Sequence, residues 1–336
     1  MLAPVSDTMS AGDRAAADAE LLELRVKRIG YEAETINSYE LVAPGGGELP
    51  PFSAGSHVDL HLTGGVIRSY SLLNDPAERH RYVVAVNRDA DSRGGSRYVH
   101  ETLRAGEVLS VSKPRNLFPL HEDASHSVLI AGGIGITPLL SMIRRLEALG
   151  RSWELFYAAR TRNAAAFLDE LQVIRPDPHL RVHLDFDDQR DGKLFDVVGI
   201  VREAPAQTHF YCCGPLPMLA AFEAATAERP VDHVHVEYFK PKEARALEGG
   251  FEVKLARSRK TVEVKPGQTI LDALLDAGVA AAYACSEGLC GTCETVVLEG
   301  VPDHRDQVLT DEERASNRTI MICCSGAISK TLVLDL

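Results

Sequence analysis

The stretch "CSEGLCGTCETVVLEG", residues 285–300, places three cysteines within nine positions of a chain that contains seven in all. Four residues separate Cys285 from Cys290, and two separate Cys290 from Cys293. This spacing is typical of a loop that binds a 2Fe-2S cluster, provided that a fourth cysteine follows downstream. Zinc is a less favoured occupant, because zinc sites more often use paired C-x2-C units. Free buried thiols are the least favoured interpretation of cysteines so close together.

The segments around this loop predict a small mixed fold. Upstream, "FEVKLARSRKTVEV" alternates apolar and polar residues, a turn follows at Pro266 and Gly267, and helical spacing begins at Ile270. Downstream come the strand "ETVVLEG", a short helix with a capping box formed by Thr310 and Glu313, and the strand "RTIMICC". Hairpin, helix, cysteine loop and strand is the order of an α+β β-grasp fold.

Residues 251–336 resemble the plant-type ferredoxins on these motifs. In that family the fourth cluster ligand lies thirty positions after the third, which implies Cys323 when counted from Cys293. Alternation along the strand "TIMICC" would place Cys323 and Cys324 on opposite faces, so that only one points at the cluster. Cys324 is then expected to be a small packed or exposed side chain.

The first third of the chain predicts a small closed antiparallel β-barrel. Between about residues 21 and 120, six short segments alternate apolar and polar residues and are separated by Gly and Pro turns. They are "LLELRVKRI", "TINSYELVA", "HVDLHL", "IRSYSLL", "RYVVAVNR" and "EVLSVSK".

One of these strands, "RSYSLLND", carries candidate flavin-binding residues. Arg68 and Tyr70 would share one face, and Ser69 and Ser71 the other. An arginine beside a tyrosine, with Ser71 and backbone amides near, offers a stacking surface and donors for an isoalloxazine ring. Taken alone, an ordinary edge strand explains these residues better.

A glycine motif further along the chain favours the flavin-binding interpretation over an ordinary edge strand. "RGGS" supplies Arg93, Gly94, Gly95 and Ser96 directly before a helical segment. Glycines and a serine at the start of a helix can cradle a phosphate with their amides. A plain Gly-Gly turn with Ser96 as the N-cap is the alternative.

The middle third predicts an α/β domain with a mostly parallel sheet. In "SVLIAGGIGITPLLSMIRRLEALG" a buried strand runs into Gly132, Gly133 and Gly135, and we expect Thr137 to be the N-cap and Pro138 the first residue of the helix. Glycines at a helix start let the backbone approach a pyrophosphate. A generic strand-turn-helix corner is about equally consistent with this motif.

Further strands, "WELFYAAR", "LRVHLDF" and "THFYCCG", give a βαβ rhythm. The last runs into Cys213, Gly214 and Pro215 at its carboxyl end, where ligands of open α/β sheets bind. Arg160 and Arg162 follow "WELFYAAR" and could bind a phosphate, a ribose or only solvent.

Together, "RSYSLLND", "RGGS", "NLFPL", "GGIGITP" and "CGP" resemble the ferredoxin-NADP reductase superfamily, and within it the phthalate dioxygenase reductase and vanillate demethylase reductase family. The resemblance implies FMN as the flavin and NADH, rather than NADPH, as the electron donor. The residues that it implies are Arg68, Tyr70 and Ser71 at the ring and ribityl chain; Arg93, Gly95 and Ser96 at the phosphate; Cys213 by the nicotinamide; and Phe239 against the flavin. A buried thiol is expected at Cys212, and a core aromatic is the alternative for Phe239.

Length and charge limit the classes of function. The chain has 336 residues, too many for one ordinary core, and a net charge of -12 argues against a nucleic-acid binder. No apolar run approaches the roughly 18 residues of a membrane span. The start, "MLAPVSDTMSAGDRAAADAE", lacks the basic and apolar regions of a signal peptide. We therefore expect a cytoplasmic protein, a monomer that binds neither nucleic acid nor membrane.

The predicted organisation is a flexible N-terminus (1–20), an FMN-binding β-barrel (21–122), an NAD-binding α/β domain (123–240), a charged linker (241–250) and a 2Fe-2S ferredoxin domain (251–336). A flavin connects a hydride donor, which delivers two electrons, with a cluster that accepts one. The first hypothesis is thus a reductase that passes electrons from NADH to a separate oxygenase, by resemblance a Rieske-type aromatic or O-demethylating enzyme. A second hypothesis replaces this acceptor with a cytochrome P450 or another protein. A third, from a different class, is a zinc-stabilised binding protein.

Overall fold

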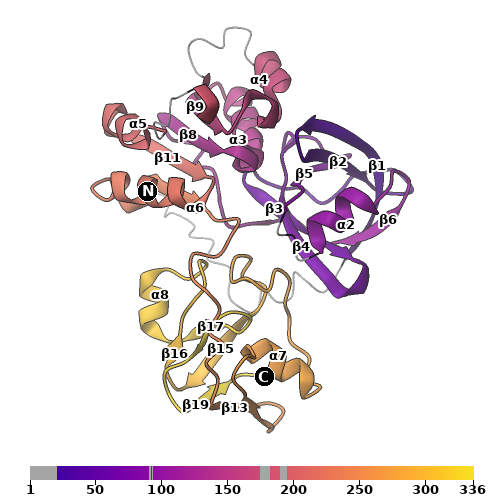
Figure 1. Ribbon diagram of the computed structural model, residues 1–336, viewed down its shortest axis with the longest axis vertical. Helices are drawn as coiled ribbons and strands as arrows, with labels where there is room; N and C mark the ends of the chain where they lie inside the picture. Colours follow the sequence, from indigo (N-terminus) through magenta and orange to yellow (C-terminus); the bar gives the residue numbers. More distant parts are fainter. Residues whose placement is uncertain (1–20, 91, 93, 175–181, 190–194) are drawn as a thin grey trace, which may run out of the picture. The chain divides into compact units, whose positions relative to one another are not determined.

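The fold is described from a computed structural model (Figure 1). The structure describes residues 21–90, 92, 94–174, 182–189 and 195–336. The predicted flexible N-terminus, 1–20, and the predicted phosphate ligand Arg93 lie outside the described residues. Contacts divide the rest into two compact units, 22–239 and 240–336, which are described separately.

The first part of unit 22–239 is an antiparallel β-barrel. Its elements are β1 (Leu22–Ala33), β2 (Ile36–Val42), β3 (Ser56–Leu62), β4 (Val66–Ser71), β5 (Tyr82–Asn87), α2 (Gly95–Glu101), β6 (Val108–Val111) and β7 (Arg115–Asn116). The strand order is β4-β3-β6-β1-β2-β5, and β7 pairs with β3. An isolated bridge between Leu72 and Val84 joins the two ends of this order and closes the sheet on itself. All six predicted strands are present; β7, only two residues long, was not predicted.

The second part of this unit is a parallel sheet in the order β10-β9-β8-β11-β12. Its strands are β8 (His126–Gly132), β9 (Ser152–Ala159), β10 (Val182–Phe186), β11 (Thr208–Cys213) and β12 (Val234–Glu237). The helices around it are α3 (Ile136–Ala148), α4 (Leu168–Ile174), α5 (Val197–Glu203) and α6 (Leu216–Thr226).

Alternation along β8 explains why both faces of this sheet are covered. Leu129 and Ala131 pack in one core with α3, whereas Val128 and Ile130 pack in another with α5 and α6. The α3 core also contains Phe118 from beyond the barrel strands. The barrel and the parallel sheet therefore share buried side chains within one unit.

Unit 240–336 has the α+β fold predicted from the cysteine motif. Its elements are β13 (Phe251–Leu255), β14 (Thr261–Val264), α7 (Ile270–Asp276), β15 (Glu294–Glu299), β16 (Pro302–Asp303), α8 (Asp311–Ser316), β17 (Thr319–Met321), β18 (Gly326–Ala327) and β19 (Thr331–Leu334). The main sheet has the order β14-β13-β19-β15-β17. The predicted capping box between Thr310 and Glu313 is confirmed at the start of α8, and α7 begins with a second one, between Thr269 and Asp272.

Part of the segment predicted as a linker is bound to the ferredoxin unit. The Lys242 N–H donates to Gln307 Oε1 at 3.0 Å, and the Ala246 N–H donates to the Cys324 carbonyl at 2.8 Å. Arg305 and Glu243 form an ion pair at 3.5 Å. These contacts begin only three residues after Phe239, the last residue of the other unit.

Among the described residues, none of the helices is both long and apolar enough to cross a membrane.

Candidate functional site

Four cysteines meet in the ferredoxin unit at the positions predicted for cluster ligands. Cys285, Cys290 and Cys293 lie in the loop between α7 and β15, and Cys323 lies in the turn after β17. The thiol of Cys285 lies close enough to those of Cys290 and Cys323 for each to affect the pKa of its neighbour, and the same is true of Cys293 and Cys323. All four side chains are buried. Four sulfurs from one loop and one distant turn are the ligand set that a 2Fe-2S cluster requires.

The backbone of this loop also fits a cluster. Gly288 and Gly291 have φ angles of 72° and 75°, in the left-handed region that favours glycine. The Glu287 N–H points at the Cys285 sulfur and donates to it at 3.4 Å. Amides directed at the sulfurs stabilise the negative charge of ligating thiolates.

The prediction that Cys323 and Cys324 alternate along a strand is wrong. β17 ends at Met321, and the Cys324 N–H donates to the Met321 carbonyl at 3.2 Å, which forms a turn where strand alternation does not apply. The Cys324 thiol donates to the same carbonyl at 3.7 Å and lies against the cysteine loop, where a Cβ at Gly288 would be 2.5 Å from its sulfur. Cys324 is therefore packed, one of its two expected roles, while Cys323 lies close to two of the other predicted ligands, Cys285 and Cys293, as well as to Cys324 itself.

Strand β4 holds the residues predicted to contact the flavin ring. The Ser69 hydroxyl donates to Asp59 Oδ1 at 2.5 Å, and Asp59 is paired with Arg115. Arg68 and Tyr70 project from the opposite face of the strand, close enough for the arginine charge to act on the phenol; burial nevertheless raises the pKa of Tyr70. Tyr70 packs against the barrel core in register with Val58, so Ser69 and Asp59 face away from that core. Because the Ser69 hydroxyl already has a partner, Arg68 and Tyr70 are the better candidates for contact with a ring.

Ser71, at the end of β4, lies opposite His57 of β3. His57 is buried, and burial together with the Arg115 charge lowers its pKa to about 4. Its Nε2 has no hydrogen-bond partner among the described residues. This neutral imidazole beside the predicted flavin strand was not predicted; its only signal was a histidine within the apolar pattern "HVDLHL".

The predicted phosphate turn lies next to Arg68. Gly94 has a φ of 102° and is the N-cap of α2. A Cβ at Gly95 would lie 2.7 Å from Cγ of Arg68, so that glycine is required where the turn passes the arginine. The Ser96 hydroxyl is held within the turn, where it accepts a backbone N–H at 3.2 Å. The two flavin motifs thus come together at Arg68 and Gly95.

The helix after the middle glycine turn starts earlier than predicted. A 3-10 turn over Gly133–Gly135 continues directly into α3, whose N-cap is Gly135 and whose first residue is Ile136. Thr137 lies inside the helix and donates its hydroxyl to the Ile134 carbonyl at 3.0 Å, so it is not the N-cap. Pro138 follows it within the first turn, where a missing N–H costs no hydrogen bond.

The glycines of this turn have different environments. A Cβ at Gly132 would lie 2.5 Å from Pro215 Cδ, and one at Gly135 would lie 2.1 Å from the Cys213 carbonyl oxygen. These two glycines allow the turn to pack on the "CGP" segment. Gly133 has a φ of 55° and nothing within 4 Å of its Cβ position, which leaves it as the glycine that a nucleotide could approach.

Cys213 lies beside an acidic side chain that was not predicted. Cys213 of β11 and Glu237 of β12 are in register, and each side chain affects the pKa of the other. Burial raises the pKa of Glu237 to about 8, so the carboxyl group is protonated at neutral pH. Burial likewise raises the pKa of the Cys213 thiol. A charged residue inside the apolar run "VHVEYF" was the available signal.

The remaining predicted residues lie at the same edge of the sheet. Gly214 and Pro215 follow β11, and Gly214 packs against Gly132. Arg160 is exposed directly after β9, and its carbonyl accepts the Asp188 N–H at 3.2 Å. Phe239 is half-buried two residues after β12. The carboxyl ends of β8, β9, β11 and β12 therefore carry the predicted nucleotide residues.

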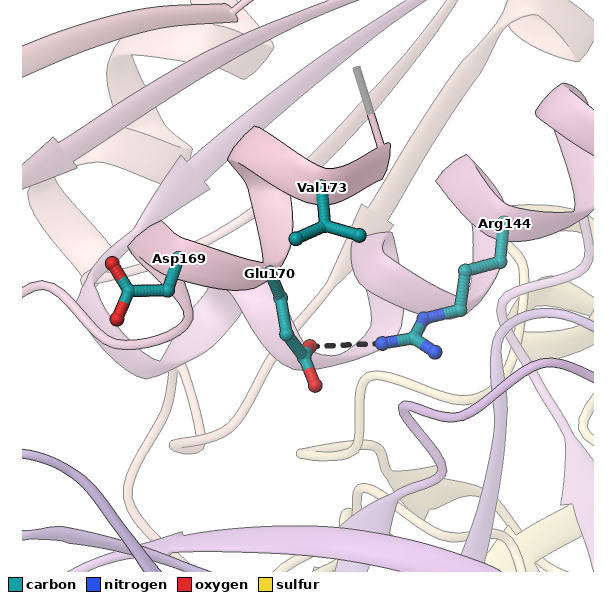
Figure 2. Close-up of a pocket in the computed structure, with 4 residues that line it drawn as sticks. All are labelled: Arg144, Asp169, Glu170 and Val173. Atoms are coloured by element: carbon teal, nitrogen blue, oxygen red, sulfur yellow. Dashed lines mark hydrogen bonds and ion pairs between the residues drawn. The ribbon is translucent and has the colours of Figure 1, made fainter. Parts of the chain in front are cut away.

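Figure 2 shows a pocket of about 380 Å³ elsewhere in this unit, between α3 and α4. It is lined by Arg144, Asp169, Glu170 and Val173, with a hydrogen-bonded ion pair of 2.8 Å between Arg144 and Glu170 (Figure 2). None of the predicted site residues lines it, so we do not assign it to the electron-transfer site.

Two family models match the chain. Residues 253–327 match a 2Fe-2S iron-sulfur cluster binding domain, and residues 129–224 match an oxidoreductase NAD-binding domain. Both matches cover the segments whose geometry is described above.

Relatives match over nearly the whole chain. The phenoxybenzoate dioxygenase subunit beta of Ectopseudomonas oleovorans is 54% identical over 96% of this chain and 99% of its own length. A solved phthalate dioxygenase reductase, described as a modular structure for electron transfer from pyridine nucleotides to [2Fe-2S], is 40% identical with a TM-score of 0.74, over 94% of this chain and 98% of that one.

A further solved structure is longer than this chain. An intact type IV self-sufficient cytochrome P450 monooxygenase is 42% identical with a TM-score of 0.82 over 94% of this chain, which spans 41% of that protein. The identities and coverage confirm the resemblance seen in the sequence. This chain belongs to the phthalate dioxygenase reductase family, in which a pyridine-nucleotide oxidoreductase and a 2Fe-2S ferredoxin are combined in one polypeptide.

Proposed function

We propose that this protein is the reductase component of an oxygenase system, which passes electrons from NADH through FMN to its 2Fe-2S cluster and on to a separate terminal oxygenase of the Rieske type. The observation that carries the proposal is the convergence of four buried cysteines in a chain that also has a glycine turn and a "CGP" segment at one sheet edge. A nicotinamide binder alone needs no cluster, and a ferredoxin alone needs no nucleotide sheet.

The residues proposed to hold FMN lie on the barrel. Arg68 and Tyr70 would contact the ring, and Gly94, Gly95 and Ser96, with Arg93, would contact the phosphate. The closeness of Arg68 to Gly95 supports a single binding region for ring and phosphate. Bound flavin supplies the conversion of a two-electron hydride into single electrons.

The residues proposed for the nicotinamide end are Cys213 and Phe239. Glu237 lies beside Cys213 on the neighbouring strand and, being protonated, adds no negative charge near the hydride donor. Gly133 would leave room for the pyrophosphate on its open side.

An acidic neighbour supports NADH over NADPH. Asp187 and Asp188 follow β10, and the Asp188 backbone is bonded to that of Arg160. Carboxylates at this edge would accept ribose hydroxyl groups and repel a 2'-phosphate.

Spectroscopy of the purified protein tests this function. We expect absorbance from both flavin and iron-sulfur cluster, bleached anaerobically by NADH faster than by NADPH. Arg68→Ala should lower flavin content, whereas Arg28→Ala, at an exposed arginine of the same barrel, should not. A protein that contains zinc and neither chromophore would reject the proposal in favour of a zinc-stabilised binding protein.

A cytochrome P450 is the second candidate acceptor. The match to a self-sufficient P450, in which a segment like this chain is joined to other sequence, favours it. Reconstitution separates the two acceptors: with NADH and this reductase, a Rieske oxygenase should turn over its aromatic substrate, and a P450 should not. Turnover by the P450 alone would assign the chain to the second role.

The protein is proposed to act as a monomer, which sedimentation would check.

A further inference from the structure

Three histidines that the electron-transfer site does not use lie together in unit 22–239. His121 belongs to the connection between β7 and β8, His209 to β11 and His235 to β12. The two strands are parallel neighbours, with His235 opposite Tyr211. The Tyr211 hydroxyl also accepts the backbone N–H of His121 at 2.8 Å, which fixes the connection beside the two strands. The fold therefore brings three imidazoles from three segments to one place.

Their spacing suits a tetrahedral metal ion. Each offers one ring nitrogen, and these atoms all lie within 4.8 Å of one another. Nδ1 of His209 is 3.2 Å from Nε2 of His235. Two nitrogens on a tetrahedral zinc ion are about 3.3 Å apart, because each Zn–N bond is about 2.0–2.1 Å long. The three rings are stacked or tilted on one another, with ring centres 4.9 Å apart for His121 and each of the other two and 5.5 Å apart for His209 and His235. The rings would therefore turn about their side-chain bonds to direct their lone pairs at one ion.

A carboxylate and a fourth imidazole lie beside the three rings. The charge of Asp232 acts on both His209 and His235. His233 stacks on His209 with ring centres 4.3 Å apart and supports its ring.

We propose that His121, His209 and His235 form a binding site for one divalent transition-metal cation of the zinc class, separate from the cysteine cluster. Three imidazoles favour Zn²⁺, Cu²⁺ or Ni²⁺ over Mg²⁺ and Ca²⁺, which prefer oxygen ligands. The ion would join the β7–β8 connection to β11 and β12. Because β12 ends at Glu237 and Phe239 follows two residues later, a bound ion would also hold in place the segment proposed to contact the flavin.

Titration of the cluster-loaded, flavin-loaded protein with Zn²⁺ alone tests the site. Calorimetry in metal-free buffer should show one Zn²⁺ bound per chain and no saturable binding of Mg²⁺. Zn²⁺ should raise the melting temperature of unit 22–239. His121→Ala should weaken binding by more than about tenfold, since even changes around a metal's ligands cost 10–100-fold in affinity. Its side chain is exposed, so the variant should fold normally.

His80→Ala is the matched control, at an exposed histidine of the barrel, and should bind Zn²⁺ like the parent protein. His209→Ala is the second ligand variant and should also lose binding. Zn²⁺ binding that is equal in the parent and in His121→Ala, or no saturable binding in the parent, would overturn the proposal. Iron content measured before and after titration separates this site from displacement of the cluster.

Discussion

The chain has two pairs of adjacent cysteines. In each pair the two thiols have different surroundings, and the structural reason differs between the pairs. Cys212 and Cys213 lie in the extended strand β11, where alternation sends Cys212 into the apolar core under α5 and α6 and Cys213 to Glu237. Cys323 and Cys324 lie in a turn, where the Cys324 and Ser325 N–H groups donate to the Met321 carbonyl and the strand has already ended. Adjacent residues can therefore have different roles in both settings, but strand alternation explains the difference only for Cys212 and Cys213.

The largest expected effect is loss of the cluster, at the pair Cys323 and Cys324. Cys323→Ser should lose or cripple the cluster, because an oxygen replaces one of four thiolates, while NADH still reduces the flavin. Cys324→Ser should keep the cluster, since this thiol donates to the Met321 carbonyl. Iron content and the visible spectrum measure both. Equal cluster loss in the two variants would contradict the assignment.

At the pair Cys212 and Cys213, the expected effect is on the rate at which NADH reduces the flavin. Cys213→Ala should slow flavin reduction by NADH by roughly tenfold to a hundredfold, since a displacement of about 1 Å in a reacting complex can cost a hundredfold. Cys212→Ala should lower stability by about 1 kcal/mol, as a core truncation does, with the rate unchanged. Stopped-flow absorbance under anaerobic conditions measures the rate. Identical rates in the two variants would remove Cys213 from the nicotinamide site.

Substitutions at two glycines near Cys213 should distinguish an effect on protein stability from an effect on NADH binding. Gly135→Ala should destabilise unit 22–239 by about 1–3 kcal/mol through overpacking, because the added Cβ would meet the Cys213 carbonyl. Gly133→Ala should cost about 1–2 kcal/mol of backbone strain and also raise the KM for NADH. Urea unfolding and steady-state kinetics measure these effects. A KM change of equal size in both would show that Gly133 has no special access to the nucleotide.

A further effect should appear in the pH dependence of stability. Glu237 has a folded-state pKa of about 8 against an ordinary value of 4.5, so between these values the folded protein binds a proton that the unfolded chain releases. Stability should therefore fall as pH rises from about 4.5 to about 8. Glu237→Gln should flatten this slope, with Glu223→Gln as the control. An unchanged slope would show that Glu237 is ionised in the folded protein.

Much of this could be predicted from sequence because the decisive features were local. The cysteine spacing, the strand alternation of the barrel and the capping box at Thr310 each depend on residues close together in the chain. The start of α3 was missed because a 3-10 turn through Gly133–Gly135 merges with the helix, which no pattern around Thr137 indicates. Glu237 and His57 could not be assigned because their pKa values depend on burial and on groups from other strands.

The contacts of Lys242 and Ala246 with the ferredoxin unit leave a very short tether after Phe239. A tether of this kind fixes how often the two units meet, whatever their arrangement. Short tethers give effective concentrations in about the millimolar range, well above those of separate proteins. Electron transfer to the chain's own cluster should therefore be independent of protein concentration, and a free ferredoxin would compete poorly for the same flavin.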